Sequence, residues 1–160
     1  MENEEFDFHE IKTFEDACRR LGISAEPLLV DSLGDTEAFL QANAFYKLMI
    51  IQKAINNGVL LDKGGWRYHP YWELYPKREI ERMNEEDMQR NGIRRLLTCA
   101  DAPDTDFSGV RRAGTCSSGA SFMFTDCSSS LCFNSKEAAL YAAHQFEDLF
   151  FQYYGIKVKA

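Results

Sequence analysis

The stretch DTEAFLQANAFYKLMIIQKAINNG, residues 35–58, carries the longest helical pattern in the chain and decides the expected fold. When its residues are placed at 100° per residue, the apolar side chains gather on two nearly opposite sides. A helix that is apolar on two sides is usually covered by neighbouring elements on both, so we expect this one to lie at the centre of the core. One apolar side comprises Ala38, Phe39, Ala42, Phe45, Tyr46 and Met49, and the other comprises Ala44, Leu48, Ile51 and Ile55.

Capping patterns predict two shorter helices before this segment. In IKTFEDACRRLGI, residues 11–23, Thr13 and Asp16 have the spacing of a capping box and Gly22 can end the helix. SAEPLLVDSLG, residues 24–34, predicts a second short helix between a serine cap and a glycine stop.

Two more helical patterns follow the central one. KREIERMNEEDMQRNG, residues 77–92, is polar and predicts a helix broken at Asn84, which can cap the acidic turn after it. NSKEAALYAAHQFEDLFFQYYG, residues 134–155, predicts a long last helix with Asn134 as its cap and Glu137 completing a capping box.

Between these last two patterns the chain has short segments of β character, separated by Pro, Gly and Ser clusters. They predict three or four antiparallel strands, and therefore an α+β fold with helices packed on a small sheet. With 160 residues and 45% hydrophobic content, the chain suits one domain over 1–160, with residues 1–10 as a flexible acidic lead-in. The strand segments are IRRLLTC (93–99), SGVRRAGTC (108–116), GASFMFTDC (119–127) and SSLCF (129–133).

Aromatic residues are concentrated in GGWRYHPYWELYP, residues 64–76, which holds both tryptophans. Pro70 favours an edge strand or an irregular segment there. We expect Trp66 and Trp72 to cover the end of the central helix, with their N–H groups satisfied at the surface. The alternative is a partner-binding patch, since tyrosine is common at interfaces, and it would use Tyr68, Tyr71 and Tyr75.

The composition limits which partners and which cellular compartment we expect. The net charge of −7 and the pI of about 5.0 oppose a general nucleic-acid or membrane surface. The five cysteines include no C-x-x-C pair, the N-terminus is acidic, and no apolar run is long enough to span a bilayer. We expect buried, reduced thiols and a cytoplasmic location.

No pattern predicts an enzyme, a metal or a cofactor. The segment GTCSSGAS, residues 114–121, has the glycine spacing of a phosphate-binding loop, but Ala120 stands where that loop needs lysine. The cysteines and histidines lack the spacing of a structural zinc site. A hydrolase would become credible if a deep cleft held a Cys or Ser beside His69 or His144.

Single-stranded nucleic-acid binding is the main alternative to protein binding. Arg94-Arg95 and Arg111-Arg112 fall on adjacent predicted strands, and aromatics are plentiful for base stacking. Because a strand alternates its side chains, each pair puts one arginine on each face. The candidate residues for this function are Arg95 and Arg112.

The last predicted helix offers a second candidate surface. Leu140, His144 and Phe151 lie together on its back, beside Glu147, although an ordinary surface helix would be polar there. Either this back is a contact surface or other parts of the domain bury it. If it is a contact surface, the simplest partner is a second copy of the chain in a homodimer.

Three segments resemble a family of small proteins from phages, prophages and mobile elements of Bacteroides-type gut bacteria. They are IKTFEDACRRLGI, AFYKLMIIQKAINNG and SSLCFNSKEAALYAAHQFEDLF, and they occur in the same order as in that family. The charged segment 77–92 and the arginine-bearing strands depart from its pattern. The resemblance implies a bacterial host cell or a virion as the location, and it supplies no catalytic residue.

The sequence thus favours a phage-type accessory protein that binds another protein or itself without catalysis. Single-stranded nucleic-acid binding is the alternative. A further alternative, suggested by charge and by the resemblance, is an acidic inhibitor of a host defence enzyme.

Overall fold

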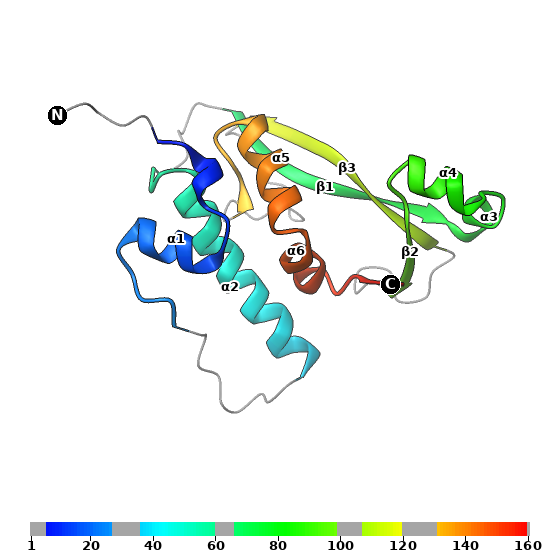
Figure 1. Cartoon of the computed structure of the whole chain (residues 1–160), viewed down its shortest axis with the longest axis horizontal. Coiled ribbons are helices and arrows are strands. Elements are labelled where there is room, and N and C mark those ends of the chain that lie inside the picture. Colours follow the sequence, from blue (N-terminus) through cyan, green and yellow to red (C-terminus); the bar gives the residue numbers. More distant parts are fainter. Residues whose placement is uncertain (1–5, 27–35, 60–65, 99–106, 120–130, 160) are drawn as a thin grey trace.

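A long antiparallel β-ribbon forms the middle of the molecule, and helices cover it near both ends (Figure 1). This is a computed structural model, and it describes residues 6–26, 36–59, 66–98, 107–119 and 131–159. Helices and one antiparallel sheet are both present, so the predicted α+β class is confirmed.

The first helix forms as its capping residues predict. α1 spans Phe14–Leu21, Thr13 and Asp16 make a complete capping box, and Gly22 ends the helix in the left-handed conformation. Before α1, the 3-10 helix η1 (Phe8–Glu10) lies within the expected acidic lead-in. The helix expected over 24–34 falls mainly on residues 27–35, which lie outside the described residues.

The central helix α2 spans Glu37–Ile55 and ends at Asn57 and Gly58, both of which have positive φ. Only one of its two apolar sides is fully covered. On the other side Phe45 stacks on Tyr153, but Ala38 and Ala42 are exposed, so the expectation of burial on both sides is wrong for the start of the helix. The buried side consists of Ala44, Leu48, Ile51, Ala54 and Ile55.

The aromatic segment forms the long strand β1 (Trp66–Pro76), which pairs along its whole length with β3 (Phe107–Gly119). β2 (Arg94–Thr98) pairs with the other side of β3, and the short β4 (Lys157–Val158) pairs with β2, which gives the order β1-β3-β2-β4. All of these pairings are antiparallel.

An isolated bridge between Tyr68 and Phe133 adds one more antiparallel segment beside β1. The sheet therefore has five segments, where the sequence predicts three or four strands. β4 was not expected at all, because two residues are too short to give a pattern. The expected strand GASFMFTDC lies almost entirely outside the described residues.

The polar segment forms two short helices, α3 (Lys77–Ile80) and α4 (Glu85–Arg90), and Asn84 caps the second as predicted. Ile80 packs with Met88 and Ile93 against Tyr75. Gly109 lies under Ile80 and Ile93 so closely that a Cβ atom there would collide with Ile80.

The last helical segment is two helices, α5 (Lys136–Gln145) and α6 (Glu147–Tyr153), separated at Phe146. Its cap is Ser135, so the capping box expected from Asn134 and Glu137 is wrong. Asn134 instead donates its backbone N–H to the side chain of Asn56.

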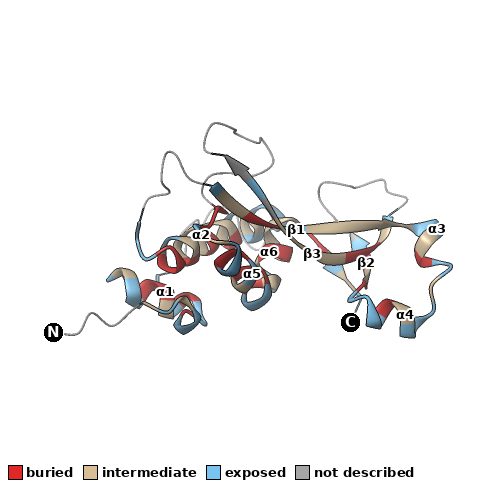
Figure 2. Cartoon of the chain, turned by 90° about the horizontal axis from the view of Figure 1, so that it is seen from above, coloured by how far each residue is buried: buried red, intermediate tan, exposed pale blue. Residues whose placement is uncertain are grey.

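The helices cover opposite faces of the ribbon at its two ends. α2, α5 and α6 pack on the face that carries Tyr68, Trp72 and Val110, whereas α3 and α4 cover the other face near Tyr75 and Gly109. Figure 2 shows buried residues along α2, α5 and α6 and a smaller buried group near α3 and α4. Among the described residues, no helix is both long and apolar enough to cross a membrane.

Phe151 lies on α6, after the break at Phe146, and is only 5% exposed under the sheet. Phe151→Ala should lower the free energy of unfolding by about 3–5 kcal/mol, because it removes a buried ring. Leu140→Ala, at an exposed position of α5, should change it by less than about 0.5 kcal/mol. Urea unfolding of both variants measures this. Similar losses in the two variants would contradict the burial of Phe151.

Candidate functional site

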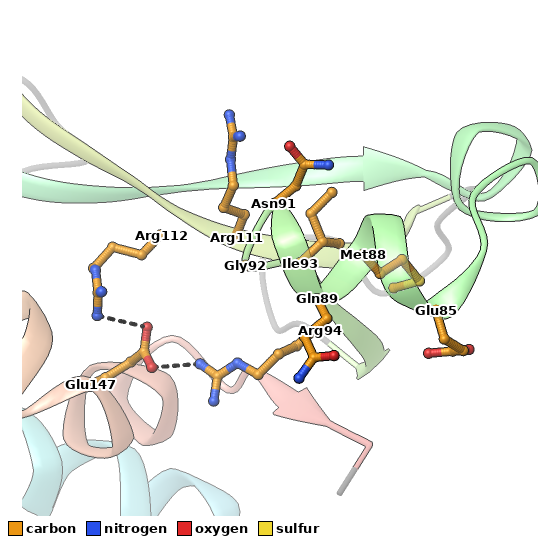
Figure 3. Close-up of a pocket in the computed structure, with 10 residues that line it drawn as sticks. All are labelled: Glu85, Met88, Gln89, Asn91, Gly92, Ile93, Arg94, Arg111, Arg112 and Glu147. Atoms are coloured by element: carbon orange, nitrogen blue, oxygen red, sulfur yellow. Dashed lines mark ion pairs between the residues drawn. The ribbon is translucent and has the colours of Figure 1, made fainter.

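A cleft of about 570 Å³ lies between α4, the start of β2, β3 and the first residue of α6 (Figure 3). Its charged lining residues are Glu85, Arg94, Arg111, Arg112 and Glu147. Met88 and Ile93, both buried, form an apolar part of its wall. We call this the arginine cleft.

Two arginines converge on one carboxylate at the floor of the arginine cleft. Arg94 Nη2 lies 2.7 Å from Glu147 Oε2, and Arg112 Nη1 lies 3.6 Å from Glu147 Oε1. Trp72 donates its indole N–H to the same Oε1 at 3.3 Å. The Arg94 guanidinium also lies over the Phe151 ring, 4.5 Å from its centre, in a cation–π contact.

Strand alternation explains which arginines meet. Arg94 is in register with Val110 and Arg95 with Gly109, so Arg94 and Arg112 share one face. The predicted split of each arginine pair between the two faces is therefore confirmed. The nucleic-acid candidates Arg95 and Arg112 do not share a surface, since Arg95 lies on the other face and pairs with Glu85.

A second group of polar and aromatic side chains occupies that other face. Arg111 donates to Glu73 at 2.6 Å, Tyr75 donates its hydroxyl to the same carboxylate at 3.2 Å, and Tyr71 is 39% exposed beside them. The hydrogen bond from Arg111 lowers the pKa of the Glu73 carboxyl, and burial raises the pKa of the Tyr75 hydroxyl. We call Tyr71, Glu73, Tyr75 and Arg111 the tyrosine face.

The predictions for the other aromatic residues of this segment hold only in part. Tyr68 and Trp72 face the helices and pack into the main core, so Tyr68 is not available as a partner residue on the tyrosine face. Trp72 covers α6, at 5.1 Å from the Phe150 ring. Trp66 is 64% exposed at the first position of β1, so the expectation that it covers the end of the central helix is wrong.

The expected contact surface on the back of the last helix is divided. Leu140 and His144 are exposed on α5, but Phe151 is buried on α6. In a single continuous helix, Phe151 would lie on the same side as Leu140 and His144. The backbone break at Phe146 turns α6 relative to α5 and separates them. For Phe151, burial by the domain is therefore the correct alternative.

A thiol and an imidazole that the sequence leaves far apart are brought together. His69 Nδ1 lies 3.1 Å from Cys132 Sγ, and both residues are buried. Burial, with a smaller effect of Arg67, lowers the pKa of His69, so the imidazole is favoured in its neutral form. A nucleophilic pair needs access for a substrate, and neither side chain lines the arginine cleft.

The expectation of buried thiols is confirmed where the structure describes the side chain: Cys18 is free and buried, and Cys132 is buried beside His69. Cys99 and Cys127, and the side chain of Cys116, lie outside the described part. Among the described residues, no group of three His, Cys, Asp or Glu side chains is placed to hold a metal ion.

The lowered pKa of His69 generates a pH prediction. The unfolded chain takes up a proton at this imidazole below a pH of about 6.5, whereas the folded protein resists it. Protonation therefore favours unfolding, and the free energy of unfolding should fall between pH 7 and about 5.5, by at most about 1.4 kcal/mol per pH unit. Urea unfolding midpoints should be measured across this range. Their dependence on pH should become weaker in His69→Gln but not in His144→Gln. An unchanged slope in His69→Gln would contradict the prediction.

No protein-family model matches this chain, and neither a curated protein nor a solved structure matches it. The resemblance to phage and mobile-element proteins stays a prediction from the sequence.

Proposed function

We propose that this protein is a non-catalytic protein-binding module and that the tyrosine face is its contact surface. The observation that carries the proposal is the exposure of Tyr71 on a β-ribbon whose face the described helices leave open at this point. Helices α3 and α4 cover this face only near Tyr75 and Gly109. An exposed tyrosine beside a fixed ion pair is typical of the residues that anchor protein interfaces.

The geometry of the tyrosine face favours a protein partner. Glu73 holds Arg111 and Tyr75 in place through two hydrogen bonds, so little side-chain entropy remains to be lost on binding. The face presents one negative and one positive charge, which suits the mixed charge of a protein surface. The sequence resemblance supports an accessory role of this kind in a phage or a mobile element.

Leu140 and His144 provide an internal comparison for this surface. They are exposed on α5, away from the tyrosine face. Phe151, the third residue of their expected group, is buried. Two exposed residues without that buried ring make a smaller apolar surface than the one the sequence predicts. Substitutions at Leu140 therefore serve as the matched control for those at Tyr71.

Self-association is the first form of binding to test, because two-fold assembly of identical chains is the commonest oligomer. Sedimentation velocity over a concentration series should show a dimer of the native protein, and Tyr71→Asp should weaken it at least about tenfold. Leu140→Asp should leave it unchanged. A native protein that stays monomeric at every concentration would contradict self-association, and equal effects of both variants would contradict the tyrosine face as the surface.

Single-stranded nucleic acid is the second candidate ligand. Tyr71 and Tyr75 share one face with Arg111, and a site for single strands combines aromatic rings that stack on bases with a positive charge. Its weakness is that Glu73 already neutralises Arg111. Labelled single-stranded DNA and RNA should therefore show no binding at about 0.15 M salt. Binding that weakens with salt and is lost in Arg111→Gln would reverse the order of the two candidates.

A further inference from the structure

The arginine cleft contains one positive charge in excess of its carboxylates. Arg95 pairs with Glu85 and Arg111 pairs with Glu73, so each has its own counter-ion. Among the described residues, Arg94 and Arg112 have only Glu147 between them. In a chain with a net charge of −7, this is a local reversal of sign.

The excess charge is available to a ligand through Arg112. Its distance of 3.6 Å to Glu147 is longer than a hydrogen bond, so the contact is an ion pair that leaves the guanidinium donors unused. Among the described residues, no hydrogen bond from the Arg112 guanidinium is present. The side chain is about one-third exposed, and it points into the arginine cleft toward Glu147 (Figure 3).

The shape of the arginine cleft suits a small molecule with an apolar body. A volume of about 570 Å³ falls within the range of small-molecule sites, which is about 300–1,000 Å³. Met88 and Ile93 supply apolar wall on the α4 side, opposite Arg112 and Glu147. Apolar walls with a few convergent polar groups are the usual composition of such sites.

We propose that the arginine cleft binds a small organic acid, with its carboxylate on Arg112 and its apolar body against Met88 and Ile93. A guanidinium matches a carboxylate through two parallel N–H donors. A single carboxylate also neutralises the single excess charge, whereas a dianionic phosphate or a polyanion would exceed it. Glu147 already shows that both arginines accept a carboxylate at this position. This proposal does not depend on the tyrosine face.

A substitution of Glu147 distinguishes a ligand-binding site from a purely structural ion pair. If the arrangement only ties α6 to the sheet, replacing Glu147 with Gln costs stability and creates no affinity for anything. If the cleft is a carboxylate site, Glu147→Gln leaves Arg94 and Arg112 without a counter-ion and should strengthen binding of an external carboxylate several-fold.

The experiment is a calorimetric or NMR titration with benzoate, against its neutral isostere benzamide, at pH 7 and constant ionic strength. Native protein should bind benzoate and not benzamide. Arg112→Gln should weaken benzoate binding at least about tenfold. Arg90→Gln, which removes the same charge from an exposed position on α4, should not change it.

Three outcomes would overturn the proposal. They are equal binding of benzoate and benzamide, unchanged benzoate binding in Arg112→Gln, and tighter binding of inorganic phosphate than of benzoate. Thermal unfolding of each variant confirms that it is folded. If Glu147→Gln does not fold, the comparison of Arg112→Gln with Arg90→Gln still decides. Within the described part of the chain Arg112 makes one long ion pair, so its loss leaves the described core intact.

Discussion

The packing of Trp72 against α6 joins the helices to the sheet, and the rest of the structure depends on it. The Trp72 ring lies 5.1 Å from that of Phe150 and 6.0 Å from that of Phe151, and it belongs to both the main core and the smaller core around Val110. Aromatic pairs of this kind contribute about 0.5–1.5 kcal/mol each beyond the area that they bury. Together with the packing of Val110 and Leu96 against Phe151, this contact fixes the position of the β-ribbon against α6.

The same contact positions the arginine cleft. The Trp72 indole donates to Glu147 at the first residue of α6, and Glu147 in turn holds Arg94 and Arg112 from two different strands. The ring of Phe151, the neighbour of Phe150, supports the Arg94 guanidinium from below. The cleft is therefore a consequence of how α6 packs on the sheet. The tyrosine face has a related origin, because the described helices pack on opposite faces at the two ends and none of them covers Tyr71 in the middle of one face.

Local sequence patterns predicted the ends of helices correctly where a single capping residue or glycine determines the backbone conformation. The capping box of α1, the break and cap at Asn84, and the glycine stops at Gly22 and Gly58 all form as expected. Strand alternation also predicted that each arginine pair splits between faces. The errors fall in the last helical segment. Ser135 rather than Asn134 caps α5, the backbone N–H of Asn134 is bound to Asn56, and the chain breaks at Phe146.

The sequence by itself therefore determined the α+β class, the central helix and the identity of the charged and aromatic residues that could form a site. Only the tertiary structure decided that Arg94 rather than Arg95 meets Arg112, that Phe151 is buried, and that His69 lies against Cys132. The physical reason is that caps, stops and side-chain alternation depend on neighbours a few residues away. Which face of a strand or helix is covered depends instead on contacts between residues that are far apart in the chain, such as Trp72 and Phe150.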